Sequence, residues 1–128
     1  MLWLMVEALR DVIAAIAGVV ESPSMFKDDL GYWVHGKEIV HFEDEDLIEI
    51  RLTRDVIRER REELRGDPRV TLRYSGADWV TVRFSEPEDV TLVVGLIEDA
   101  ADAHRAPSGV TPDPPPTGSE LERRRRFH

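Results

Sequence analysis

Apolar residues at the start of the chain recur at the spacing of one helical face. This pattern predicts an amphipathic helix over residues 3–17, ended by Gly18. A second helix is expected over 53–65, with Thr53 as its N-cap. A third is expected over 85–104, where an apolar stripe follows a capping-box sequence, Ser85 to Glu88. Caps and terminators thus define three helices. Two stretches of chain, 18–52 and 66–84, lie between them.

Both of these stretches are rich in β-branched and aromatic residues. After an extended run over 19–26, strands are expected at 32–34, 38–42 and 47–52, and a hairpin at 69–74 and 79–84. The predicted order is α-β-β-β-α-β-β-α. Strands grouped as hairpins between helices indicate an α+β two-layer sandwich, in which three helices cover one face of an antiparallel sheet of about five strands.

The central hairpin has a register that gathers apolar side chains on one face. The pairs that achieve this are Glu38–Leu52, Val40–Ile50 and Phe42–Ile48. On the opposite face, here called the outer face, His41 then lies opposite Glu49 and Ile39 lies opposite Arg51. This register predicts that Glu38 points toward the core and that Ile39 points outward.

The outer face carries the strongest functional signal in the sequence. Its candidate ligand-binding residues are His41, Glu49, Arg51, Arg73, Trp79 and Arg83. Guanidinium groups and an indole suit an anionic or planar ligand, through bidentate hydrogen bonds and stacking. Two alternatives remain open. The face is an ordinary solvated sheet surface, or it is a homodimer interface in which Trp79 and Ile39 pair across a twofold axis.

Catalytic and metal sites have weaker support. His41 and Glu49 are the candidates for an acid–base pair, in which the carboxylate fixes the imidazole tautomer. His41 and Glu43 project to the same side of their strand, and His35 precedes them, but a complete ligand set cannot be assembled from the sequence. The acidic run 43–46 lacks the spacing and the glycine of an EF-hand. We therefore predict no metal site, and the cofactor is unknown.

Composition narrows the class of partner. The chain has 128 residues, a formal net charge of −9 and no cysteine, which excludes disulfides and thiolate metal sites. Its acidity argues against duplex nucleic acid and anionic membranes as partners. Charged residues interrupt the apolar start, so we expect neither a membrane span nor a signal peptide, and a cytoplasmic location. A folded domain is expected over 1–105, followed by a disordered, Pro-rich tail over 106–128 that contains the basic block 123–126.

The run Gly36-Lys37-Glu38-Ile39-Val40-His41-Phe42, the acidic loop after it and Asp78-Trp79-Val80 give the chain a family likeness. It resembles small prokaryotic proteins with a luciferase domain, a family of largely unknown function, over residues 3–104. That family has a glycine, a basic residue and a glutamate before a His-x-His pair. Here Glu43 stands where the second histidine would be, and the likeness adds Lys37 to the ligand-binding candidates.

The sequence thus predicts a domain that binds a small molecule or a protein partner through the outer face. The alternative that the resemblance implies is a luciferase-like or other small-molecule oxidoreductase, which would use His41 with a nearby carboxylate. Substrate, cofactor and oligomeric state are left open.

Overall fold

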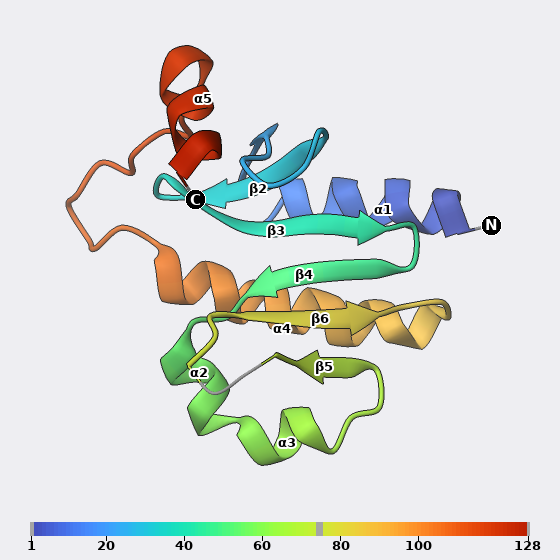
Figure 1. Cartoon of the computed structure of the whole chain (residues 1–128). Coiled ribbons are helices and arrows are strands. Elements are labelled where there is room, and N and C mark those ends of the chain that lie inside the picture. The colour runs from blue at the N-terminus through green and yellow to red at the C-terminus, as the bar shows by residue number, and fades with distance from the viewer. Residues whose placement is uncertain (1, 74–75, 128) are drawn as a thin grey trace.

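The computed structural model describes residues 2–73 and 76–127 and contains one antiparallel sheet with helices around it (Figure 1). Residues 74 and 75, predicted to end a strand and begin a turn, lie outside the described residues. The elements in chain order are α1 (Leu2–Ala14), β1 (Val20–Pro23), β2 (Leu30–Val34), β3 (Lys37–Asp44), β4 (Leu47–Arg51), α2 (Arg54–Glu59), α3 (Arg61–Arg65), β5 (Val70–Leu72), β6 (Trp79–Arg83), α4 (Pro87–His104) and α5 (Gly118–Phe127).

The α+β class and the antiparallel sheet are confirmed. In the described residues the sheet has six strands in the order β1-β2-β3-β4-β6-β5, one more than expected because the extended run after α1 pairs with β2. The predicted second helix is divided at Arg60 into α2 and α3. The third helix begins one residue later than its predicted capping box, with Glu86 as N-cap and Asp89 as the reciprocal partner.

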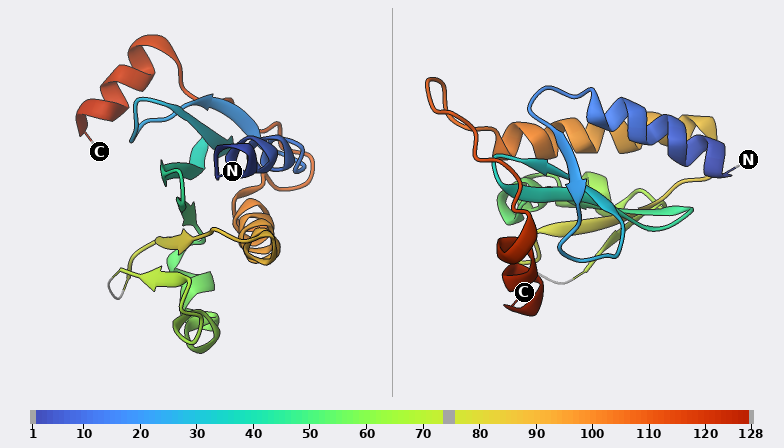
Figure 2. Two further views of the ribbon diagram at one scale, coloured as in Figure 1. Left: turned by 90° about the vertical axis from the view of Figure 1, so that its right-hand side faces the viewer. Right: turned by 90° about the horizontal axis from the view of Figure 1, so that it is seen from above.

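The core lies between the sheet and the two long helices, α1 and α4, which lie on the same side of it (Figure 2). The expected pairs Val40–Ile50 and Phe42–Ile48 are present, and these four side chains belong to the core. His41 lies opposite Glu49, also as expected. Hydrophobic matching was therefore sufficient to place the central hairpin in its correct register.

Two β-bulges interrupt β3, one on each side of His41. Between β2 and β3, Tyr32 pairs with Val40 and Trp33 with Glu38, so Ile39 is an extra residue. Between β3 and β4, the register shifts after Phe42 and leaves Glu43 unpaired. An extra residue breaks the alternation of side chains. The predicted positions of Glu38 and Ile39 are consequently wrong, because Ile39 is fully buried in the core and the Glu38 carboxylate lies beside His41 on the outer face.

The C-terminal segment returns to the sheet and ends in α5, next to β2 (Figures 1 and 2). Arg125 donates two hydrogen bonds to the carbonyl of Ser24, and Arg124 donates one to the carbonyl of Gly36. In the structure, part of the segment predicted as a disordered tail is thus a helix in contact with the domain. The division at residue 105 remains a prediction. No helix within the described residues has the length and apolar character needed to cross a membrane.

Candidate functional site

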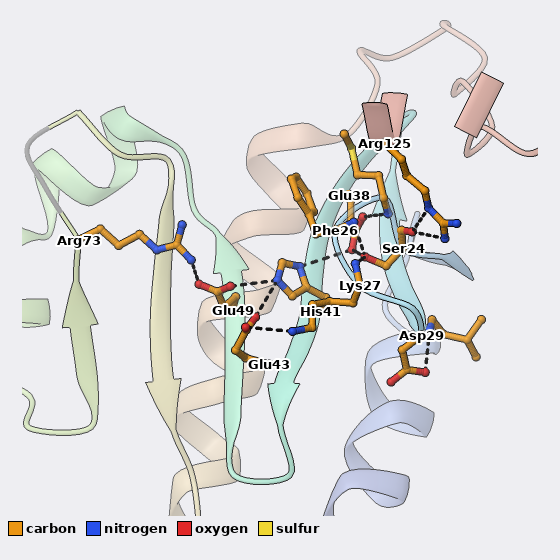
Figure 3. Close-up of polar contacts among 12 residues, drawn as sticks. Ser24, Phe26, Lys27, Asp29, Glu38, His41, Glu43, Glu49, Arg73 and Arg125 are labelled. Carbon is orange, nitrogen blue, oxygen red and sulfur yellow. Dashed lines mark hydrogen bonds and ion pairs between the residues drawn. The ribbon is translucent and has the colours of Figure 1, made fainter. Parts of the chain in front are cut away.

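His41 is the centre of a polar cluster on the outer face (Figure 3). Its Nε2 atom lies 3.0 Å from Oε1 of Glu49 and 3.5 Å from Oε2 of Glu43, and its Nδ1 atom lies 3.4 Å from Oε2 of Glu38. The His41 side chain is only 5% exposed, whereas that of Glu43 is 40% exposed. The cluster therefore has three carboxylates around one buried imidazole and reaches solvent on the Glu43 side.

Each of the two carboxylates that face Nε2 is held from behind by a cation. Lys27 donates to Oε1 of Glu43 at 3.0 Å, and mainly this hydrogen bond lowers the pKa of Glu43. Arg73 forms an ion pair with Oε2 of Glu49, which also accepts a hydrogen bond from Thr81 at 3.2 Å. In both residues one oxygen is fixed by these partners while the other faces the imidazole.

Glu38 connects the cluster to the segment of residues 24–29, which we call the covering segment. The Glu38 carboxylate is fully buried and accepts hydrogen bonds from the Ser24 hydroxyl at 2.5 Å and from the Met25 amide at 2.8 Å. These bonds hold the start of the segment at the sheet, and Lys27 holds it again at Glu43. The bulge that turns Glu38 outward thus provides the acceptor for the first two residues of this segment.

Aromatic rings surround the imidazole. The ring centroids of Phe26 and Trp79 lie 5.4 and 5.1 Å from that of His41, and 5.4 Å from each other. Arg51 lies over the Trp79 ring at 5.0 Å, a cation–π contact. Burial lowers the pKa of Arg51, although Asp78 and Glu38 oppose this effect. The guanidinium stays charged, because arginine is not deprotonated in proteins.

Five of the seven ligand-binding candidates come together, and two do not. His41, Glu49, Arg51, Arg73 and Trp79 are linked by the contacts above, which Figure 3 shows in part. Lys37 is exposed at the start of β3, and Arg83 binds Asp46 in the turn after β3.

We expected the outer face to be open at His41, but it is covered there. Phe26 and Trp79 pack against the imidazole, and the His41 side chain is only 5% exposed. The arginines there already have internal partners: Arg73 has Glu49, and Arg51 has the Trp79 ring. The geometry therefore does not favour the anionic ligand suggested by the sequence.

Sequence reasoning missed the contributions of Glu38, Phe26 and Lys27. No periodicity marks the covering segment, and the bulge that reorients Glu38 has no signature in the residue pattern. His35, which we considered as a metal ligand, does not belong to the cluster. Its Nδ1 atom accepts a hydrogen bond from the Asp113 amide. Instead, His41, Glu43 and Glu49 each offer one atom to a group whose members lie within 4.8 Å of one another. The sequence analysis named Glu49 as a candidate for ligand binding and acid–base chemistry, but not as the third metal ligand beside His41 and Glu43.

A cavity of about 430 Å³ adjoins the cluster. It lies between α1, the covering segment and the end of β3, and Lys27 and Glu43 belong to both the cavity and the cluster. Trp3, Val6 and Phe42 give it an apolar part. Its charged lining has two basic residues, Arg10 and Lys27, and six acidic ones: Glu7, Asp28, Asp29, Glu43, Asp44 and Glu45. This volume is within the range of small-molecule sites.

A match to a known family model covers the part of the chain that holds this cluster. The family model of the luciferase domain matches residues 36–100, which is half of the chain. The chain belongs to the luciferase-domain family. No curated protein and no solved structure matches it. The match begins at Gly36 and includes the cluster residues of β3, β4 and β6, whereas the covering segment and α5 lie outside it.

Proposed function

We propose that this luciferase-domain protein binds a small organic molecule in the cavity between α1 and the end of β3. The observation that carries the proposal is that the cavity shares Lys27 and Glu43 with the His41 cluster. Binding sites typically combine an apolar hollow with a few convergent polar groups. Here Glu43 lines the hollow and also lies 3.5 Å from the Nε2 atom of the buried imidazole.

The lining favours a ligand with an aromatic or aliphatic body and a positive charge. Trp3 is 65% exposed although it lines the cavity, so its indole is available for stacking. The acidic residues outnumber the basic ones by six to two, which attracts a cation and repels an anion. An aromatic ring that carries an alkylamine has both properties, because an alkylamine is protonated at neutral pH.

The test uses two probes with the same ring and opposite charge, phenethylamine and phenylacetate. Each is titrated into the full-length protein and binding is followed by the thermal midpoint and by tryptophan fluorescence. We expect a saturable rise in midpoint with phenethylamine and a much smaller effect with phenylacetate, because only the amine complements the acidic lining. A ligand at about 100 times its dissociation constant stabilises the folded state by about 2.7 kcal/mol.

Trp3→Ala should weaken the binding of phenethylamine. Leu4→Ala is the matched control, because Leu4 is also exposed on α1, at 56%, but does not line the cavity. Equal responses to the two probes, or equal binding by the Trp3 and Leu4 variants, would contradict the proposal. The enzymatic role of His41 with Glu49 and the homodimer remain predictions that this experiment does not address.

A further inference from the structure

We propose that His41, Glu43 and Glu49 bind a divalent transition-metal ion, with the Nε2 atom of His41 and one oxygen of each carboxylate as ligands. The inference concerns the same cluster as the proposed function but goes beyond it and does not depend on it. The spacing of the three donor atoms, the groups that orient them and the donor types support it.

The spacing of the donors fits a single ion. Two atoms that each lie about 2.1 Å from one metal are about 3.0 Å apart at an octahedral angle and about 3.4 Å apart at a tetrahedral angle. The Nε2 atom of His41 lies 3.0 Å from Glu49 Oε1 and 3.5 Å from Glu43 Oε2. One atom from each of the three residues lies within 4.8 Å of the others, so the side chains need to move only slightly to bring all three donors onto one ion.

The groups behind the donors are those that metal sites use to orient their ligands. A metal-bound histidine usually donates its other N–H to a carboxylate, and bound carboxylates are themselves held by hydrogen bonds. His41 Nδ1 is buried and makes no hydrogen bond within the described residues, while Oε2 of Glu38 lies 3.4 Å away. A movement of a few tenths of an ångström makes that bond and leaves Nε2 free for the ion.

The second oxygens of the two ligand carboxylates are already engaged. Lys27 holds the outer oxygen of Glu43, and Arg73 with Thr81 holds that of Glu49. Each carboxylate thus presents one oxygen, as a monodentate ligand does. Lys27, Arg73 and Glu38 would serve as positioning residues around the three ligands.

The donor types limit the choice of ion. One imidazole and two carboxylates suit borderline ions of the first transition row, such as Zn²⁺, Fe²⁺ or Co²⁺. Ca²⁺ requires six to eight oxygen ligands, which this cluster does not provide. Three protein ligands leave coordination positions free, and these would lie on the Glu43 side, since His41 and Glu49 are buried and Glu43 is 40% exposed.

The experiment titrates the full-length protein, stripped with a chelator, with Zn²⁺ by calorimetry and with Co²⁺ by visible absorption. We expect one Zn²⁺ per chain, a Co²⁺ absorption band that Zn²⁺ abolishes, and no saturable binding of Ca²⁺. Glu43→Gln is the main variant, because this exposed residue can be changed without disturbing the core. It should weaken Zn²⁺ binding by at least the ~10–100-fold that outer-shell changes cause.

Glu45→Gln is the matched control, an exposed carboxylate in the turn after β3 that is not one of the three proposed ligands. It should bind Zn²⁺ as the parent does, as should His35→Ala. Absence of a one-to-one complex, or equal binding by the Glu43 and Glu45 variants, would overturn the proposal. Zn²⁺ binding without phenethylamine binding removes the proposed function alone, and phenethylamine binding without Zn²⁺ binding removes the metal site alone.

Discussion

Gly31 and Glu38 give the sharpest test of how the cluster is built. A Cβ atom at Gly31 would overlap Oε2 of Glu38 and lie 2.8 Å from its carboxyl carbon. Glu38 cannot simply swing away, because its two oxygens accept the hydrogen bonds from Ser24 and Met25. We therefore expect Gly31→Ala to displace the buried carboxylate and to release the start of the covering segment.

The magnitude follows from these contacts. Glu38→Ala leaves the buried Ser24 hydroxyl and the partly buried Met25 amide without their acceptor. Each loss costs about 1–3 kcal/mol, so the total is at most about 6 kcal/mol. Gly31→Ala alone should cost about 1–3 kcal/mol, the usual range for overpacking. In the double variant the clash no longer exists, so adding the Gly31→Ala change to the Glu38→Ala background should cost close to nothing.

The assay is urea unfolding of the parent, the two single variants and the double variant, compared as a double-mutant cycle. We expect a coupling energy of about 1–3 kcal/mol that favours the double variant. Additive costs would refute the reasoning, because they would mean that the added methyl group at position 31 does not act through the Glu38 carboxylate. Amide exchange in residues 24–27 provides a second readout, since it should increase in both single variants.

Two further predictions test the periphery of the domain. Burial, with some repulsion from Arg51, lowers the pKa of His104 in the folded protein. The unfolded chain therefore binds this proton more readily, and the stability should fall as the pH drops from about 7.5 to about 5.5. Urea unfolding of His104→Gln should show a shallower loss over this range, and an identical slope would exclude His104 as the cause. Deletion of residues 106–128 should leave a folded domain whose circular dichroism differs from the parent's only by the loss of the α5 helix. Amide exchange in residues 24–27 should become faster, because the hydrogen bonds from Arg125 to Ser24 are lost. An unfolded product would show that the domain does not end at residue 105.

The sequence was informative where a whole face is apolar. The register of β3 and β4 followed from matching Val40 with Ile50 and Phe42 with Ile48, since a slip by one residue would expose the entire set. The placement of His41 opposite Glu49 came with that register. The central contact of the cluster was therefore accessible from residue types alone.

The rest of the cluster depends on backbone detail and on contacts between distant segments. A bulge adds a residue without changing the pattern of residue types, so the outward turn of Glu38 was not predictable. The covering segment and α5 have little apolar periodicity of their own. They take their positions from single tertiary contacts, such as Arg125 with the Ser24 carbonyl, which composition does not indicate.

The energetic cost of the cluster is itself an argument that it has a function. The side chains of His41, Glu38 and Glu49 are taken almost completely out of water, with exposures of 5, 0 and 7%. Buried ion pairs rarely stabilise a protein more than apolar residues of the same size would. The strand also departs from regular pairing on both sides of His41, at Ile39 and at Glu43. Departures from the most stable arrangement are expected where a site requires them. If the cluster only stabilised the fold, replacing His41 and Glu49 together with Leu and Met would lower the stability and leave the Zn²⁺ titration unchanged. We expect the stability to be retained and the Zn²⁺ titration to be lost.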